Sequence, residues 1–379
     1  MLLPPGAVVL QILPRLESGG VERGTVEIVQ AIVASGGRAL VASEGGRLEA
    51  AVRRHGGQHV TLKLASKNPA RIWGNAARLE ALIREQHVRL VHARSRAPAW
   101  SAWAAARRAG VRFVTTYHGV YDESLPGKRA YNAIMARGER VIAISRFVQS
   151  LLIRRHHLDP ARIRVIPRGI DPTLFDPEAV TTDRLARLAA AWLLPDGAPT
   201  IMLPARLSRW KGHAVLIEAM ARLQRQDAVC LLVGPLEERG RFAQQLDRQA
   251  RQLGLAGRVR LTGHCADMPA ALMLADVVVS ASTAPEGFGR AVIEGQAMGR
   301  PVIATDHGGA AETVEHGVTG WRVPPGDPAA LATALDAALA LGAEARQALG
   351  RRARAAVLAN YTTKAMQEAT IAVYRELLD

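Results

Sequence analysis

Two glutamates, Glu286 and Glu294, bracket a segment whose composition could bind a polar ligand. The segment opens with the turn-forming run 285–289 and continues with apolar residues at helical spacing over 291–298. Backbone N–H groups at the start of such a helix bind anions and hydroxyl-rich ligands, and carboxylates accept hydrogen bonds from hydroxyls. The spacing therefore predicts a site for a hydroxylated ligand, with two solvated helix-end acids as the alternative.

Two cations, Arg206 and Lys211, lie in a loop between a predicted strand that starts at Thr200 and a helix expected to start near His213. Positive side chains at a helix N-terminus attract the same ligand as the helix dipole. This arrangement predicts a binding site for a diphosphate, whereas the simpler interpretation is a pair of solvated basic residues.

A histidine and a glycine pair follow two strands of the first half of the chain. His118 follows the strand-like run 112–116 and Tyr117. Gly19 and Gly20 follow the first predicted strand, 7–13. Ligands of open parallel sheets bind at the carboxyl ends of strands. His118 is thus a candidate ligand contact, although a lone histidine is more often structural, and the glycine pair fits a plain turn as well. The glycines do not form the G-x-G-x-x-G pattern of dinucleotide-binding proteins.

Strand and helix patterns alternate along the whole chain, which predicts parallel sheets covered by helices on both faces. Trp73, Trp100 and Trp103 fall in helical segments and are expected mainly in the core, with an exposed, membrane-facing tryptophan as the alternative. The other strands are predicted at 39–43, 59–64, 90–93, 141–145, 228–234, 259–263, 277–280 and 301–305, and helices at 48–54, 69–86, 97–109, from 328 onward and at 363–378.

The run from Ala275 to Glu312 resembles the signature of glycosyltransferase family 4, whose members are retaining enzymes that use nucleotide sugars. The resemblance is carried by Glu286 and Glu294 with seven residues between them, the Gly-Phe-Gly after Glu286, and the Gly-x-Pro-Val-Ile-Ala-x-x-x-Gly-Gly run ending at Gly309. It implies the α/β GT-B fold, in which two Rossmann-like doubly wound parallel-sheet domains face each other across a cleft. The domains are expected at 1–175 (acceptor side) and 176–358 (nucleotide sugar), with a terminal helix in 359–379 that crosses back to the first.

The resemblance also implies roles for individual residues. Glu286 and His118 are the expected catalytic residues, with Glu286 positioning the donor sugar rather than attacking it, because the departing phosphate is the usual base in this family. The remaining assignments are Arg206, Lys211 and Gly20 for the donor diphosphate, Glu286, Gly287, Phe288 and Gly289 for the donor sugar, and Glu294, Gly263 and His264 for the nucleoside.

No Asp-x-Asp occurs in the sequence, so we expect neither a metal nor another cofactor. Metal-dependent glycosyltransferases use that pair to hold a divalent ion on the diphosphate. Arg206, Lys211 and the helix dipole are expected to compensate the leaving-group charge here.

Two positions depart from the family's motifs. Arg168 stands where the family's Pro-Asn-Gly-Val-Asp motif has asparagine, and Ala205 replaces the usual glycine before Arg206. An arginine cannot accept a hydrogen bond as asparagine can, so the role of position 168 is open. The run 141–145 resembles the last strand of the family's first domain.

The net charge of +15 is concentrated in one half of the chain. Residues 1–170 hold 27 Lys and Arg against 11 Asp and Glu, whereas residues 171–379 hold 22 against 23. The positive charge of residues 1–170 implies an anionic partner. We expect this partner to be an anionic glycolipid or glycan, together with the inner-membrane surface, rather than nucleic acid. The two cysteines, Cys230 and Cys265, and the lack of a signal-like start predict a cytoplasmic protein, peripheral on the inner face of the cytoplasmic membrane.

The sequence thus predicts a metal-independent transfer of a hexose-type sugar, preferably from a UDP-sugar, to a cell-envelope acceptor such as lipopolysaccharide core. A UDP-sugar epimerase of the same fold is the alternative, and a non-enzymatic basic protein that binds nucleic acid or membranes is the more distant one.

Overall fold

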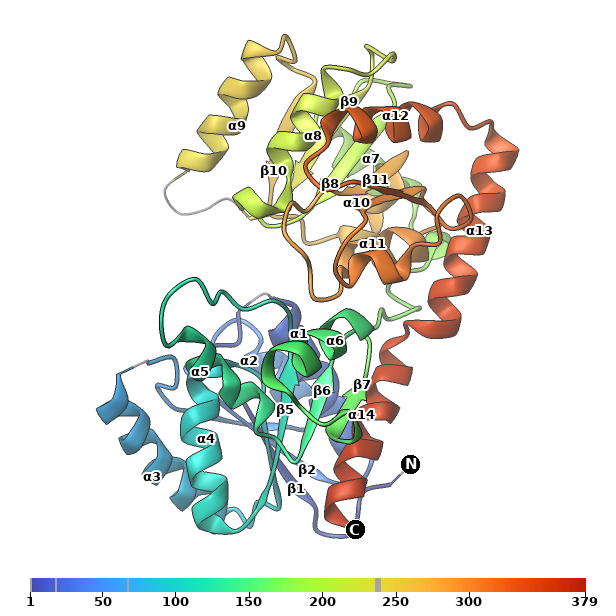
Figure 1. Ribbon diagram of the computed structural model, residues 1–379. Coiled ribbons are helices and arrows are strands. Elements are labelled where there is room, and N and C mark those ends of the chain that lie inside the picture. The colour runs from blue at the N-terminus through green and yellow to red at the C-terminus, as the bar shows by residue number, and fades with distance from the viewer. Residues whose placement is uncertain (1, 18, 67, 236–239) are drawn as a thin grey trace. The chain divides into compact units, whose positions relative to one another are not determined.

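The computed structural model describes residues 2–17, 19–66, 68–235 and 240–379. The chain divides into two compact units, each with its own sheet (Figure 1). Unit 1 is Met1–Arg168 with Thr363–Asp379, and unit 2 is Gly169–Thr362. The terminal segment of the chain therefore belongs to the same unit as the first strand.

Within the described residues, unit 1 contains a seven-stranded parallel sheet in the order β3-β2-β1-β4-β5-β6-β7. β1 is the point where the strand order reverses, since it pairs with β2 on one side and β4 on the other. In parallel sheets such a point is the usual place for ligands. The strands are β1 (Val8–Ile12), β2 (Arg38–Ser43), β3 (Gln58–Thr61), β4 (Leu90–Ala93), β5 (Arg112–Tyr117), β6 (Arg140–Ala143) and β7 (Ile163–Val165).

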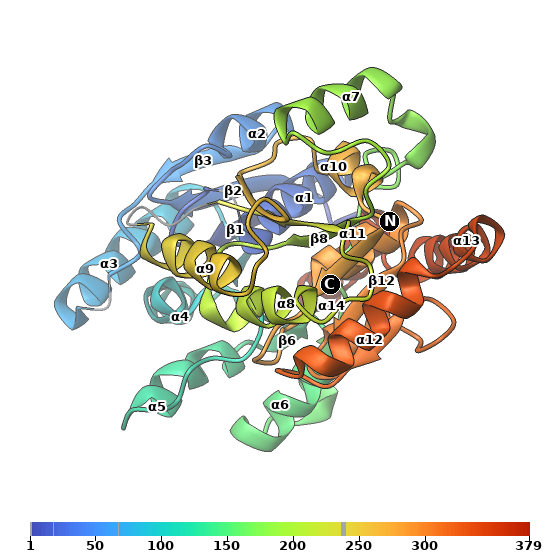
Figure 2. The ribbon, with the colours of Figure 1, turned by 90° about the horizontal axis from the view of Figure 1, so that it is seen from above.

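Helices of unit 1 cover its sheet, and the last helix of the chain packs against the first (Figures 1 and 2). Met366, Ile371 and Tyr374 of that last helix share a buried core with residues of the first two strands. The helices are α1 (Gly20–Ala34), α2 (Glu49–Arg54), α3 (Pro69–Glu85), α4 (Arg96–Ala109), α5 (Lys128–Asn132), α6 (Arg146–His156) and α14 (Thr363–Leu378), with short 3₁₀ turns η1 (Ala133–Ala136) and η2 (Pro160–Arg162).

In the described part of unit 2, six parallel strands are ordered β10-β9-β8-β11-β12-β13. The central strands are continuous buried apolar runs, as expected for a sheet covered on both faces. The strands are β8 (Thr200–Pro204), β9 (Val229–Val233), β10 (Val259–Gly263), β11 (Val277–Ser280), β12 (Val302–Thr305) and β13 (Trp321–Val323).

The helices of unit 2 alternate with these strands. The two segments that connect the units pair in unit 2 through a bridge between Ile170 and Thr362. The helices are α7 (Thr182–Ala191), α8 (His213–Met220), α9 (Arg241–Gln252), α10 (Met268–Leu274), α11 (Arg290–Ala297), α12 (Pro328–Leu339) and α13 (Ala343–Asn360), with 3₁₀ turns η3 (Pro177–Ala179), η4 (Arg209–Lys211) and η5 (Ala310–Thr313).

Two expectations from the sequence are wrong. The run 141–145 does not supply the last strand of the first unit, because β7 pairs beyond β6. Trp73 is not a core residue but is 61% exposed, and the guanidinium of Arg108 lies over its ring. Trp100 and Trp103 are half-buried and pack edge to face against each other.

Among the described helices, none is by itself long and apolar enough to cross a membrane. The adjacent α12 and α13 meet the length and composition criteria only when taken together, with a bend of 111° between them.

Candidate functional site

A glycine fixes the loop that carries Lys211 against the end of a neighbouring strand. Gly212 ends η4 and caps α8 with φ of 75°, a left-handed conformation that favours glycine. A Cβ atom there would lie 1.8 Å from the Ala281 carbonyl oxygen, just after β11. The Thr283 amide also donates to the Trp210 carbonyl at 2.8 Å. The Lys-Gly turn after β8 thus packs closely against the loop that follows β11.

This packing brings the side chain of Lys211 into contact with Glu286. The Lys211 Nζ atom lies 2.8 Å from Glu286 Oε1, and the two side chains are only 18% and 12% exposed. The same carboxylate oxygen accepts from the Ser282 hydroxyl, and more distantly, at 3.4 Å, from Ser280. A carboxylate oxygen that contacts a cation and two hydroxyls is held in position.

The paired glycines Gly308 and Gly309 hold the backbone of the Glu286 loop. Added Cβ atoms would lie 2.6 Å from the Glu286 carbonyl oxygen at Gly308 and 2.2 Å from the Gly287 carbonyl oxygen at Gly309. The Gly309 amide donates to the Glu286 carbonyl at 2.8 Å. The residue before the pair, His307, donates from Nε2 to the Ser282 carbonyl at 2.7 Å. Both ends of the loop are therefore fixed by the segment after β12.

α11 begins directly after this loop. Gly289 caps the helix with φ of 88°, and a Cβ atom there would meet the Ala310 side chain at 2.8 Å. Phe288 is buried and packs edge to face on Tyr361, with 5.6 Å between ring centroids. Glu294 is 9% exposed and lies 3.5 Å from Arg290, one turn earlier on the helix. Glu286 and Glu294 therefore occupy different environments, the first in the loop and the second on the helix.

Arg206, Gly263 and His264 follow the carboxyl ends of nearby strands. Arg206 is exposed and has no hydrogen bond or ion pair with any other described residue, which leaves its guanidinium available to an anion. Gly234, after β9, would place a Cβ 2.0 Å from the Ala205 carbonyl oxygen, and its amide donates to the Gly263 carbonyl at 2.9 Å. Gly263 has φ of 76°, and His264 is exposed.

The positive charge of this region comes from Lys211 and Arg206 rather than from the nearby histidine. His213, the first residue of α8, is fully buried, and this burial lowers its pKa to about 4. His213 is therefore neutral at pH 7. No group of three or more His, Cys, Asp or Glu side chains in the described ranges is arranged to hold a metal ion.

In unit 1, the side chain of Arg168 contacts both His118 and Gly20. The sequence had assigned no role to Arg168. Arg168 is 6% exposed, and its Nη2 donates to the Gly20 carbonyl at 3.2 Å and to His118 Nδ1 at 3.1 Å. Burial and the cations Arg168 and Arg94 hold the pKa of His118 well below its usual value. The departure from the family motif at Arg168 was the only signal in the sequence that pointed to this contact.

Ser282 was also missed. Its position two residues after the end of β11 resembles an ordinary strand-to-loop transition, and only the fold shows that its hydroxyl donates to Glu286.

Comparisons with known sequences cover both halves of the chain. Residues 187–356 match the family described as Glycosyl transferases group 1, and residues 18–174 match Glycosyltransferase Family 4. The GDP-mannose-dependent alpha-(1-6)-phosphatidylinositol monomannoside mannosyltransferase of Mycolicibacterium smegmatis is 32% identical over 274 residues, which cover 69% of each chain. The D-inositol 3-phosphate glycosyltransferase of Salinispora tropica is 30% identical over 68% of this chain, and the match spans 58% of that relative's length.

Solved structures match over nearly the full length. A glycosyltransferase from Rickettsia africae is 36% identical with a TM-score of 0.91, covering 99% of both chains. HepE of Anabaena in complex with UDP-glucose is 25% identical with a TM-score of 0.85, covering 97% of this chain and 99% of HepE. Together with the sequence matches, these likenesses show that the chain belongs to glycosyltransferase family 4 and has the GT-B fold.

Proposed function

We propose that this protein transfers a hexose-type sugar, with retention of configuration, from a UDP-sugar to a hydroxyl of a cell-envelope glycan or glycolipid such as lipopolysaccharide core. The observation that carries the proposal is the ion pair of Lys211 and Glu286, together with Arg206, which has no partner among the described residues; all three lie in loops that follow unit 2 strands. The complex of HepE with UDP-glucose supports a UDP-sugar, whereas the mycobacterial relative is named as dependent on GDP-mannose.

The donor diphosphate is assigned to Arg206, Lys211 and the N-terminus of α8. A diphosphate leaving group develops negative charge in the transition state, and preorganised cations stabilise that charge without a reorganisation step. This arrangement supports our expectation that transfer needs no metal.

The donor sugar is assigned to Glu286 and the amides of the Gly287–Gly289 turn, and the ribose to Glu294. The Glu286 carboxylate accepts from Lys211 and Ser282, which reduces its nucleophilicity and favours a positioning role. Deprotonation of the acceptor is assigned to the departing phosphate. Gly263 and His264 are assigned to the nucleoside.

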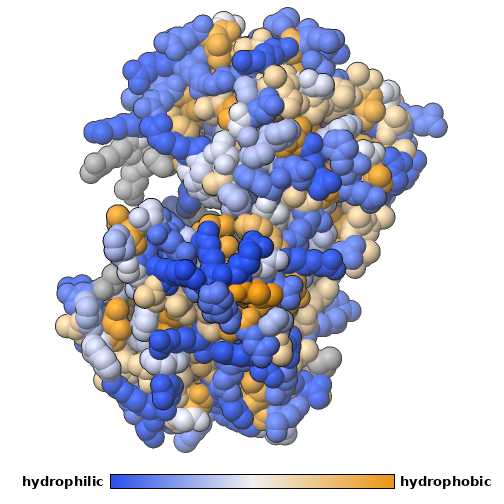
Figure 3. All heavy atoms as spheres, viewed as in Figure 1, coloured by the Kyte–Doolittle hydropathy of each residue, from blue (hydrophilic) through white to orange (hydrophobic). Residues whose placement is uncertain are grey.

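The acceptor is assigned to an anionic lipid-linked glycan because residues 1–170 carry 27 basic against 11 acidic residues. On this unit Trp73 is exposed beneath Arg108, and hydrophilic and hydrophobic side chains are intermixed on the visible face (Figure 3). Exposed tryptophan with basic residues is typical of proteins that bind the surface of a bilayer. We place the enzyme on the inner face of the cytoplasmic membrane.

The experiment that tests this function measures binding and hydrolysis of UDP-, GDP- and ADP-sugars in EDTA. We expect selective binding and slow hydrolysis of one UDP-sugar. Glu286→Gln and Arg206→Ala are each expected to reduce turnover on the order of 10²-fold. Glu344→Gln and Arg248→Ala, which change exposed residues of α13 and α9, are the matched controls and should retain activity.

The outcomes separate the alternatives. Binding of no nucleotide sugar, or near-normal turnover of Glu286→Gln, would refute the assignment. Preference for GDP-mannose would correct the donor only. Isomerisation of the UDP-sugar without an acceptor would identify an epimerase instead.

A further inference from the structure

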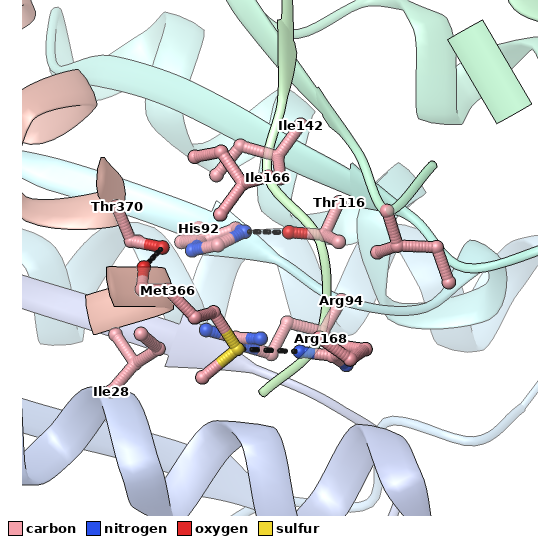
Figure 4. A pocket seen from close by; sticks show the side chains of 10 residues that line it. Ile28, His92, Arg94, Thr116, Ile142, Ile166, Arg168, Met366 and Thr370 are labelled. Carbon is pink, nitrogen blue, oxygen red and sulfur yellow. Dashed lines mark hydrogen bonds between the residues drawn. The ribbon is translucent and has the colours of Figure 1, made fainter. Parts of the chain in front are cut away.

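Arg168 is buried in unit 1 among residues from three different elements. Its Nη1 lies 3.7 Å from the Met366 sulfur of α14, a contact visible in Figure 4. Its Nη2 donates to the carbonyl of Gly20, the first residue of α1, and to His118 Nδ1 after β5. A guanidinium has a planar set of donors, so this combination of contacts fixes its orientation as well as its position.

The first helix is shaped to admit this guanidinium. Gly24 is buried in α1, and a Cβ atom at that position would lie 2.5 Å from Arg168 Nη1. Glycine in a helix interior is less favourable than alanine by about 1 kcal/mol. The contact with Arg168 gives a specific reason for this glycine.

The contact determines which nitrogen of His118 carries the proton. Arginine only donates hydrogen bonds, so Nδ1 must accept with its lone pair and the neutral ring must be protonated at Nε2. The Nε2 atom is buried and has no hydrogen-bond partner among the described residues. A buried N–H without a partner is unfavourable and is available to an oxygen of a bound ligand.

We propose that Arg168 is a positioning residue that holds His118 as the neutral Nε2–H tautomer, so that His118 donates a hydrogen bond to an oxygen of the bound sugar or acceptor. The tautomer follows from the contact between Arg168 and His118 Nδ1 alone. The identity of the group that accepts a hydrogen bond from His118 Nε2 rests on the function proposed above. In this state His118 cannot be a general base, because Nδ1 is occupied by the guanidinium and Nε2 has no lone pair.

The surroundings of His118 favour the neutral ring. Arg168 and Arg94 face it as cations, and His92 lies nearby with its two nitrogens bonded to Tyr374 and Thr116 at 2.6 and 2.7 Å. Figure 4 shows Arg94, Arg168 and His92 around one small cavity. Glu27 of α1 is the acid that faces Arg94.

The test is ¹⁵N NMR of the full chain labelled at histidine, with the His118 signals assigned by difference from His118→Gln. We expect a protonated Nε2 and an unprotonated Nδ1 that persist as the pH falls through about 6.5, the ordinary pKa of histidine. Arg168→Met removes the donor and should give mixed tautomers. Arg168→Gln, whose amide can donate to Nδ1, should retain the Nε2–H form. Arg164→Gln, on β7 of the same unit, is the control and should not change the spectrum.

Either of two results would overturn the proposal: a proton on Nδ1 in the unaltered protein, or an unchanged tautomer in Arg168→Met. In sugar transfer with the preferred donor, we expect Arg168→Met to lower kcat about tenfold, the equivalent of one hydrogen bond, with Arg168→Gln restoring most of it. A normal kcat in Arg168→Met would refute the role in transfer. The NMR result needs no substrate, so it stands or fails separately from the proposed function.

Discussion

Gly212→Ala is the substitution that most directly tests how the Lys211 turn is held. The backbone there has φ of 75°, where alanine is less favourable than glycine by about 1 kcal/mol. In addition, the new Cβ would lie 1.8 Å from the Ala281 carbonyl oxygen. Since Cβ atoms do not approach other atoms closer than about 3.0 Å, the turn must retreat by more than 1 Å. A displacement of that size at a catalytic group can reduce turnover by about 10²-fold.

Gly257→Ala is the matched control. Gly257 has φ of 79° and no atom within 4 Å of the position that its Cβ would occupy, so this variant carries the backbone penalty without the clash. We expect it to lower the free energy of unfolding by about 1 kcal/mol and to leave donor binding unchanged. Gly212→Ala should lose about 2 kcal/mol more and bind the donor at least tenfold more weakly.

Urea unfolding followed by tryptophan fluorescence and calorimetric titration with the preferred nucleotide sugar would measure both quantities. The reasoning would be refuted if the two alanine variants had equal free energies of unfolding and equal donor affinities. That result would mean that the Lys211 turn moves away from Ala281 without consequence.

Three further predictions concern charge. Lys211→Met and Glu286→Gln should couple by about 1–3 kcal/mol in a double-mutant cycle of unfolding, and additivity would show that the pair is not coupled. Because the pKa of His213 is about 4 when folded and about 6.5 when unfolded, the unfolded state binds more protons between these values, and stability should fall as the pH falls. The slope is about 1.4 kcal/mol per pH unit for this group, and an unchanged slope in His213→Gln would contradict it. The unaltered protein should co-sediment with anionic vesicles but not with neutral ones, and equal co-sedimentation with both would argue against the basic surface.

Several strands were predictable from short apolar runs of their own. β4, β10 and β11 have the bounds expected from the sequence, and so does α14. Two strands were not predicted as strands of these sheets: β7 and β13, each three residues long with an arginine at the centre. So short a segment has no periodicity of its own, and it becomes a strand only because the edge of an existing sheet offers it hydrogen-bond partners.

The candidate site was predictable as a set of residue types but not as a set of contacts. Glu286 and Lys211 could each be identified from its own segment, yet their ion pair depends on Gly212 fitting against Ala281. Gly212 and Ala281 lie in different loops, after β8 and β11, so no local sequence pattern could predict their contact.

Arg168 shows why a departure from a family motif has to be considered together with its neighbours in space. Its guanidinium occupies the volume that a side chain at position 24 would need and donates to a histidine fifty positions away in the sequence. Arg168→Asn, which restores the family residue, would leave that volume empty and Nδ1 of His118 without its cationic donor. We therefore expect Arg168→Asn to be less stable than the unaltered protein, and Arg168→Asn combined with Gly24→Ala to recover part of the loss, because the added methyl group fills part of the space. If the double variant were less stable than Arg168→Asn alone, Gly24 would be required for a reason other than the guanidinium.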